Sequence, residues 1–437
     1  MTSDYEKLRE YVFTLEIIDT HEHLPPFEKD RPKDVDVLAE YLRHVFSSDL
    51  VSAGLSDEGL ALARDAKKPL MKRWKTVEPY WEVSRHTGYG RSLDVAVREL
   101  YGIDGINGKT IGKLNEAFLA TFSGGHYDRV LKETSRIRCS MEDWQSACVA
   151  RSGERVDGRY FRPVFRCDGF IAPESKTNLD ALAKLTGVPI HSLDDLKHAC
   201  EVYVDRNVRE GAVAIKTGLA YVRPLRFEKV SEAEASEDFT KLFGDSNVVW
   251  ERAGAWPLRK LQDHMVHFVC TLAQKRGLPM QVHTGLQEGN GNFIYHAEPS
   301  QLSNLFMEYR GVRFDVFHIG YPYQQTLSAL AKNFPNVFID FAWAHIISPE
   351  AAIRALVEYL DAVPVNKILG FGGDYAFIDG VAGHAWIARE NVAKALAFKV
   401  KHGSFDLDRA CELARMILHD NAAAVFKLDK TPRKKSR

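Results

Sequence analysis

Short β-rich runs alternate with helical stretches along most of this 437-residue chain, and this alternation constrains the fold more than any other feature. Strands separated by helices pair in parallel, so the pattern predicts a parallel sheet covered by helices. We expect eight strands, at Leu15–Thr20, Arg136–Cys139, Tyr160–Cys167, Ala212–Thr217, Pro279–Thr284, Phe314–Ile319, Val337–Phe341 and Lys367–Phe371. The main helices expected around them are Ser192–Val208, Pro257–Arg276, Pro299–Tyr309, Tyr323–Asn333, Pro349–Ala362, His384–Lys401 and Leu407–Lys427.

Eight strand–helix units favour an α/β fold of the closed (β/α)8 TIM barrel type. An open doubly wound sheet is the alternative, but it usually carries a glycine-rich phosphate loop after its first strand, where this chain has His21-Glu22-His23. Residues from about 27 to 125 interrupt the alternation with helical periodicity, which predicts a helical insertion after the first strand. We expect one barrel domain over residues 1–429, closed by the C-terminal helix, and a basic disordered tail at 430–437.

Composition narrows the cellular setting and the partners. The formal net charge is −1, which gives no electrostatic reason to expect nucleic acid or an anionic membrane as a partner. No apolar run approaches a signal peptide or a membrane span. The cysteines contain no C-x-x-C pair and predict a reducing compartment; they are Cys139, Cys148, Cys167, Cys200, Cys270 and Cys411. We therefore expect a cytoplasmic protein that acts on a small molecule.

The first strand ends in two histidines separated by one residue. Side chains alternate faces along a strand, so His21 and His23 point the same way and Glu22 points the other way. Two imidazoles on one face supply half of a tetrahedral metal shell. The other ligands must therefore come from elsewhere in the chain.

Metal-binding and catalytic residue types recur at the ends of later strands, where barrel enzymes assemble their sites. Three imidazoles and a carboxylate suit a divalent metal, with zinc preferred and Mn²⁺, Fe²⁺ or Ni²⁺ as alternatives. A carboxylate beside such a metal can also move a proton, which is the role we expect for Asp374. The strand-end residues are Lys216, His283, His318, Trp343, His345 and Asp374.

This arrangement resembles the signature of the amidohydrolase superfamily, from Asp19 to the Asp420-Asn421-Ala422-Ala423 sequence near the C-terminus. The sequences around Lys216, His283-Thr284-Gly285 and His318-Ile319-Gly320 are similar to the branch with amidohydrolase domains fused to glutamine-synthetase-like proteins. That branch is related to decarboxylases of the aminocarboxymuconate semialdehyde type. The long helical insertion is more similar to uronate isomerase.

The resemblance implies that one divalent metal is bound by His21, His23, His283 and Asp374, and that His318 polarises the substrate or moves a proton. The resemblance allows two roles for Lys216. In binuclear members a carboxylated lysine after the fourth strand bridges two metals, whereas in single-metal branches the lysine pairs with a substrate carboxylate. We favour one metal.

Other residues are candidates for substrate recognition. Arg166 ends the third strand, and Tyr221 and Arg223 follow the fourth; together with Lys216 they would suit a carboxylate. Trp343 and His345 follow the seventh strand and are also candidates. Residues 289–292 form either a mobile lid or a polar turn. The insertion, with Trp81, Arg85 and His86, either covers the barrel mouth or makes oligomer contacts.

These observations predict a metal-dependent hydrolase in which metal-activated water attacks a C–N or C–O bond of a small, polar, carboxylate-bearing substrate. The alternative is a decarboxylase or a uronate-type isomerase on the same site. A non-catalytic barrel is the hypothesis of a different class, and stoichiometric metal would argue against it. A homo-oligomer is compatible with the sequence.

Overall fold

The structure, a computed structural model, describes residues 3–143, 156–243 and 258–428; Cys148, Pro257 and the basic tail lie outside these ranges. Eight parallel strands pair in chain order, each with the next. This order confirms the predicted (β/α)8 barrel, because a doubly wound sheet reverses its strand order. The strands are β1 (Ile17–Glu22), β2 (Ile137–Glu142), β3 (Phe161–Arg166), β4 (Ala214–Thr217), β5 (Met280–Val282), β6 (Phe314–Val316), β7 (Val337–Asp340) and β8 (Ile368–Leu369).

The first and last strands approach each other through the residues that follow β8. The N–H of Thr20 donates to the carbonyl of Phe371 at 3.0 Å. Beyond the strand ends, the N–H of Asp374 donates to the carbonyl of His21 at 2.8 Å. This lateral pairing places residues from the two ends of the chain on one rim of the barrel.

Helices cover the outside of the barrel, and several begin where the sequence supplies a cap. The Ser192 hydroxyl accepts from the N–H of Asp195 at the start of α10, and Ser348 caps α16. Helix α17 begins at Ile378, earlier than the expected His384. Its first turns are buried on most sides, so the sequence there lacks the polar face that indicates a surface helix. The helices between β2 and β8 are α8 (Asp168–Ile171), α9 (Lys176–Thr186), α10 (Leu193–Arg209), α11 (Glu232–Thr240), α12 (Arg259–Arg276), α13 (Ser303–Glu308), α14 (Gln324–Asn333), α15 (Ala344–Ile347) and α16 (Pro349–Ala362). Helix α17 (Ile378–Lys401) follows β8.

Short turns of helix connect many of these elements. They are η4 (Leu219–Tyr221), η5 (Lys241–Phe243), η6 (Ile294–Ala297), η7 (Pro299–Leu302), η8 (Phe317–Gly320) and η9 (Val365–Lys367). Within the described residues, no helix is both long enough and apolar enough to cross a membrane.

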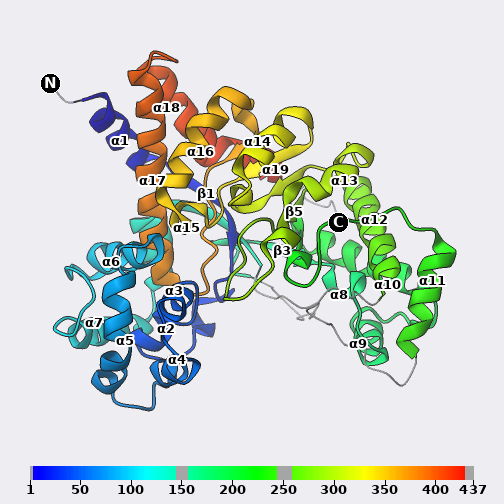
Figure 1. The fold of residues 1–437 in the computed structure, drawn as a ribbon, viewed down its shortest axis with the longest axis horizontal. Coiled ribbons are helices and arrows are strands. Elements are labelled where there is room, and N and C mark those ends of the chain that lie inside the picture. Colours follow the sequence, from blue (N-terminus) through cyan, green and yellow to red (C-terminus); the bar gives the residue numbers. More distant parts are fainter. Residues whose placement is uncertain (1–2, 144–155, 244–257, 429–437) are drawn as a thin grey trace, which may run out of the picture.

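The segment between β1 and β2 is helical, as its periodicity predicts. It contains α2 (Val37–Tyr41), α3 (Phe46–Ser52), α4 (Asp57–Arg64), α5 (Leu70–Ser84), α6 (Gly88–Tyr101) and α7 (Ile111–Ala120), with the short turns η1 (Glu28–Asp30), η2 (Thr121–Ser123) and η3 (Asp128–Thr134). These helices gather at one end of α17, while α8–α12 lie on the other side of the strands (Figure 1). Helix α6 crosses α17 closely at Gly383, where any side chain would collide with the Ser92 carbonyl.

The two ends of the chain pack against the barrel and its longest helix. Helix α1 (Asp4–Thr14) lies against α17. The expected C-terminal helix is divided into α18 (Leu407–Arg415), the π-helical turn η10 (Met416–Asp420) and α19 (Asn421–Phe426). In this turn the Ile417 carbonyl accepts from the N–H of Gly370 at 2.8 Å, which joins the C-terminal segment to the strand β8 region.

Candidate metal centre and active site

A cavity of about 380 Å³ opens at the carboxyl ends of the strands, where the sequence predicted the site. His21, His23, His283 and Asp374, the expected ligands, all line it. Lys216, Arg166, Tyr221 and Trp343 line it too. The fold therefore brings most of the predicted site residues to one place.

The two histidines of the first strand lie together, as strand alternation requires. Their ring centroids are 4.6 Å apart. Asp374 Oδ1 lies 3.4 Å from His21 Nε2 and 3.3 Å from His23 Nε2. Two imidazole nitrogens and one carboxylate oxygen thus converge from opposite ends of the chain.

The protonation states of this group suit a metal ligand set. Burial and the nearby charge of Lys216 lower the pKa of His21 to about 3, so the His21 ring is neutral at pH 7. Burial opposes ionisation of Asp374, but His21 and His23 hold its pKa well below the usual value. His23 Nδ1 donates to the Asp143 carbonyl at 2.6 Å, which leaves the Nε2 lone pair directed at the group.

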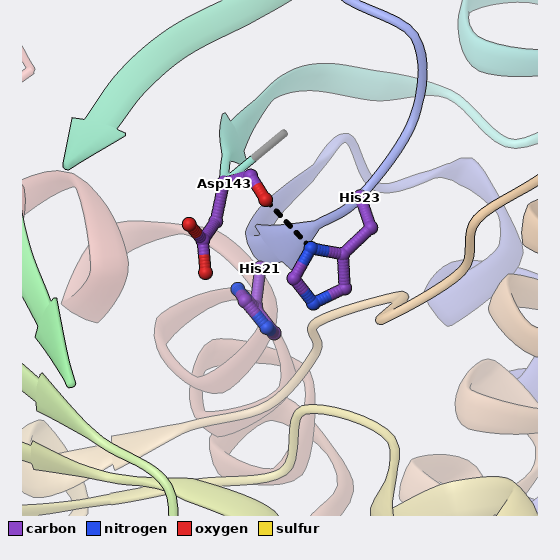
Figure 2. A group of neighbouring side chains, drawn as sticks. All are labelled: His21, His23 and Asp143. Atoms are coloured by element: carbon purple, nitrogen blue, oxygen red, sulfur yellow. Dashed lines mark hydrogen bonds between the residues drawn. The ribbon is translucent and has the colours of Figure 1, made fainter. Parts of the chain in front are cut away.

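A second carboxylate, Asp143, belongs to the same cluster. Ligand atoms of His21, His23 and Asp143 lie within 4.8 Å of one another, and Figure 2 shows these side chains with the His23–Asp143 hydrogen bond. Both oxygens of Asp143 also accept from Arg166, at 2.6 to 3.1 Å. Sequence reasoning missed Asp143 because the second strand was expected to end at Cys139. The acidic pair after Met141 was the available signal.

His283 and His318 form a pair beside this cluster. His318 Nδ1 donates to the Ala342 carbonyl at 2.8 Å, and His318 Nε2 lies 3.0 Å from His283 Nδ1. His283 Nε2 lies 3.0 Å from the Leu286 carbonyl. Burial lowers the pKa of both rings, that of His318 to about 4, so both rings are neutral and each carries one N–H. Two N–H groups cannot donate in all three contacts. One nitrogen of His283 therefore carries a lone pair that faces another acceptor, either the Leu286 carbonyl or His318 Nε2.

Lys216 is buried at the end of β4, with 1% of its surface exposed. Its ammonium lies 3.4 Å from His21 Nε2 and 3.6 Å from the centre of the Phe317 ring. Burial and the charge of Arg166 lower the pKa of Lys216 to about 8. The contact with the aromatic face stabilises the ammonium form.

Two of the predicted substrate-binding residues, Arg223 and His345, are not among the described residues that line the cavity. Arg223 is buried, and its Nη2 donates to Asp263 at 2.6 Å, so its charge serves to join the loop after β4 to α12. His345 is buried in α15, where its Nε2 donates to the Gly370 carbonyl at 2.9 Å. Trp343, with φ of 61°, ends the extended chain before His345.

The insertion reaches the cavity through residues that the sequence did not single out. His44 and Val45, between α2 and α3, line the cavity. His44 Nδ1 is buried and has no hydrogen-bond partner in the described part of the chain. Trp81 instead packs between Trp74 and Phe46, and Arg85 pairs with Asp94. Tyr89 of α6 stacks on Trp343 at a ring distance of 5.9 Å.

Buried neutral histidines beneath the site predict acid sensitivity. Burial lowers the pKa of His345 to about 4, so this ring takes up a proton near pH 6.5 only when the chain unfolds. Above pH 6.5 the neutral His345 ring makes its full contribution to the free energy of unfolding. This contribution is lost as the pH falls from 6.5 toward 4, by about 2 kcal/mol at pH 5. Urea denaturation at pH 7 and pH 5 should show a smaller loss for His345→Gln than for the unmodified chain.

The exposed His402 provides the control for this measurement, and His402→Gln should keep the full pH dependence. An equal loss of stability in His345→Gln and in the unmodified chain would contradict the prediction.

Comparisons with known proteins agree with this geometry. Residues 246–428 match the family model described as Amidohydrolase. The chain is 22% identical to uronate isomerase from Nostoc punctiforme, over 88% of this chain and 86% of that protein. It is 24% identical to uronate isomerase from Shouchella clausii over 66% of this chain, and 28% identical to protein fluG from Emericella nidulans over 35% of this chain.

The matches span 62% of the Shouchella protein and 18% of fluG. Among solved structures, uronate isomerase from Thermotoga maritima superposes with a TM-score of 0.80 at 15% identity, covering 98% of both chains. At this identity the superposition establishes a shared fold. The barrel, the His-x-His strand end, the aspartate after β8 and the match over residues 246–428 together make this chain similar to the amidohydrolase superfamily.

Proposed function

We propose that this chain is a metal-dependent isomerase that interconverts the aldose and ketose forms of a small polyhydroxy acid of the uronate type. The observation that carries the proposal is the position of Lys216, whose ammonium lies 3.4 Å from His21 in the same cavity as Asp374. A cation at this point can hold an anionic oxygen of the substrate beside the histidine–carboxylate cluster. Similarity to uronate isomerases along most of the chain supports this chemistry over hydrolysis.

The residues fit one divalent metal ion. His21, His23 and Asp374 would hold it, with His283 and Asp143 as the adjacent donors. Zinc suits this set of imidazole and carboxylate groups. The Lys216 ammonium lies against Phe317, which favours the single-metal reading over a carboxylated lysine that bridges two metals. When bound, the metal would supply Lewis-acid polarisation of a substrate oxygen.

We assign proton transfer to Asp374 and His318. Asp374 Oδ2 lies 3.7 Å from His318 Nε2, so the two groups are neighbours at the site. In the proposed isomerisation one of them would take the proton from one carbon and return it to the next carbon, while a hydroxyl proton moves between the two neighbouring oxygens. His318 is held in place through its Nδ1 by the Ala342 carbonyl. Trp343 and Tyr221 form walls of the cavity.

Purified protein with its metal content measured should be incubated with D-glucuronate and D-galacturonate in D₂O. Proton NMR would show ketose formation and exchange of the carbon-bound hydrogen, and chelator-treated protein is the control. Conversion of neither uronate would contradict the proposal.

Hydrolysis is the second candidate, favoured by the Amidohydrolase family match and by the pairing of His318 with Asp374. Release of ammonia, acid or alcohol from an amide and ester panel would support it, and carbon dioxide release would indicate a decarboxylase. We further propose a cytoplasmic location, no nucleic-acid or membrane partner, and a homo-oligomeric state that size-exclusion chromatography can measure.

A further inference from the structure

Glu288 is a cavity residue whose carboxylate has no hydrogen-bond or ion-pair partner among the residues that the structure describes. It follows β5, is half-buried and lines the cavity. In the residues that the structure describes, its carboxylate accepts no hydrogen bond and forms no ion pair. The charge of Arg64 is near Glu288, but the hydrogen bonds of its guanidinium go to other residues. Arg64 Nε donates to the Leu42 carbonyl at 2.7 Å, and Nη2 donates to Ser47 Oγ at 2.9 Å.

The backbone around Glu288 is held in place on both sides. The N–H of Glu288 donates to the Tyr221 hydroxyl at 3.0 Å. Gln287 Nε2 donates to the Ala220 carbonyl at 2.5 Å. Asn290 Nδ2 donates to the Ser48 carbonyl at 3.2 Å, which ties this stretch to the insertion. Glu288 is thus presented to the cavity by a fixed scaffold, and this placement leaves a partly desolvated carboxylate to be satisfied by a ligand.

The cavity lining consequently carries charges of both signs. Lys216, almost fully buried, supplies a cation on the β4 side, and the charge of the neighbouring Arg166 is already matched by Asp143. Glu288 is more exposed than Lys216. Burial and the charge of Asp374 raise the pKa of Glu288 more than Arg64 and His23 lower it, so a further negative charge beside Glu288 would be unfavourable. Hydroxyl donors would instead be favoured there.

We propose that Glu288 determines specificity by accepting hydrogen bonds from substrate hydroxyl groups beside it and by excluding a second carboxylate from that position. The inference rests on the proposed function for the anionic group placed at Lys216. It assigns the substrate class as a monoanionic polyhydroxy acid. Two carboxylate oxygens match two neighbouring hydroxyl groups, while two carboxylates facing each other repel.

The test uses three probes that contain no aldehyde and therefore cannot be isomerised. They are D-gluconate, with one carboxylate and a hydroxylated chain, D-glucarate, with a carboxylate at both ends, and hexanoate, with no hydroxyl group. Calorimetry on the protein as purified should show D-gluconate binding about ten-fold more tightly than D-glucarate or hexanoate.

Glu288→Gln keeps the shape of the side chain and removes the charge. It should weaken D-gluconate about five-fold, strengthen D-glucarate and bring their affinity ratio close to one. Glu116→Gln, the same substitution on an exposed face of α7, should leave all three affinities unchanged. Thermal melts of both variants establish that they fold.

An unchanged ratio in Glu288→Gln would overturn the assignment, as would hexanoate or D-glucarate binding as tightly as D-gluconate, or no D-gluconate binding at all. Turnover of uronates is measured separately. The expected affinity pattern without turnover would refute the isomerase and leave the Glu288 assignment intact.

Discussion

Asp374→Asn is expected to lower kcat/KM by about 10³-fold and to remove most of the bound metal. The carboxylate lies 3.4 Å and 3.3 Å from the Nε2 atoms of His21 and His23, and asparagine removes its charge while keeping its shape. Asp374 has φ of 53°, a conformation that asparagine tolerates better than most residues, so the variant should fold. Metal content by mass spectrometry and turnover of the identified substrate provide the measurements.

Asp408→Asn is the matched control, since this aspartate is exposed on α18, outside the cavity. It should retain both metal and activity. Full metal content and full turnover in Asp374→Asn would show that the cluster of His21, His23 and Asp374 is not the reactive centre. A melting temperature close to that of the unmodified chain would exclude misfolding as the cause of a loss.

Gly373→Ala is expected to destabilise the protein by about 3 kcal/mol, because the added carbon has no room. A Cβ at Gly373 would lie 1.6 Å from Glu22 Oε1. Neither side can easily move: the Gly373 N–H donates to Asp19 at 2.9 Å, and Glu22 Oε2 accepts from the N–H of Tyr375 at 2.9 Å. Urea denaturation measures the loss, and metal content reports whether the neighbouring Asp374 is displaced.

Gly112→Ala is the control, because nothing lies within 4 Å of its Cβ position on α7; it should be neutral or stabilising. The double variant Gly373→Ala with Glu22→Ala should recover part of the stability if the clash with Glu22 is the cause. Wild-type stability in Gly373→Ala alone would show that the rim between β1 and the residues after β8 is more adaptable than this geometry implies.

The candidate site was only partly predictable, and its missed residues have a common origin. Asp143 was missed because β2 extends to Glu142, beyond its expected end. His44 was missed because it lies in a helical segment, where no strand alternation predicts the direction of a side chain. Arg223 was expected to face the substrate because of its charge, but its guanidinium donates to Asp263 on α12. In each case the side chain's direction depends on a partner distant in sequence.

The number and order of the strands and the shared face of His21 and His23 follow from the sequence alone, because periodicity is a local property that each element carries wherever it packs. Tertiary packing sets which carboxylates approach those histidines and which cations remain available to a substrate. It also leaves the Glu288 carboxylate without a hydrogen-bond partner among the described residues. These outcomes depend on barrel closure through the Asp374 and Thr20 backbone bonds and on loop conformations such as that of Trp343, with φ of 61°. Distances across a barrel rim arise from the packing of all eight strands and their loops together, so no single stretch of sequence encodes them.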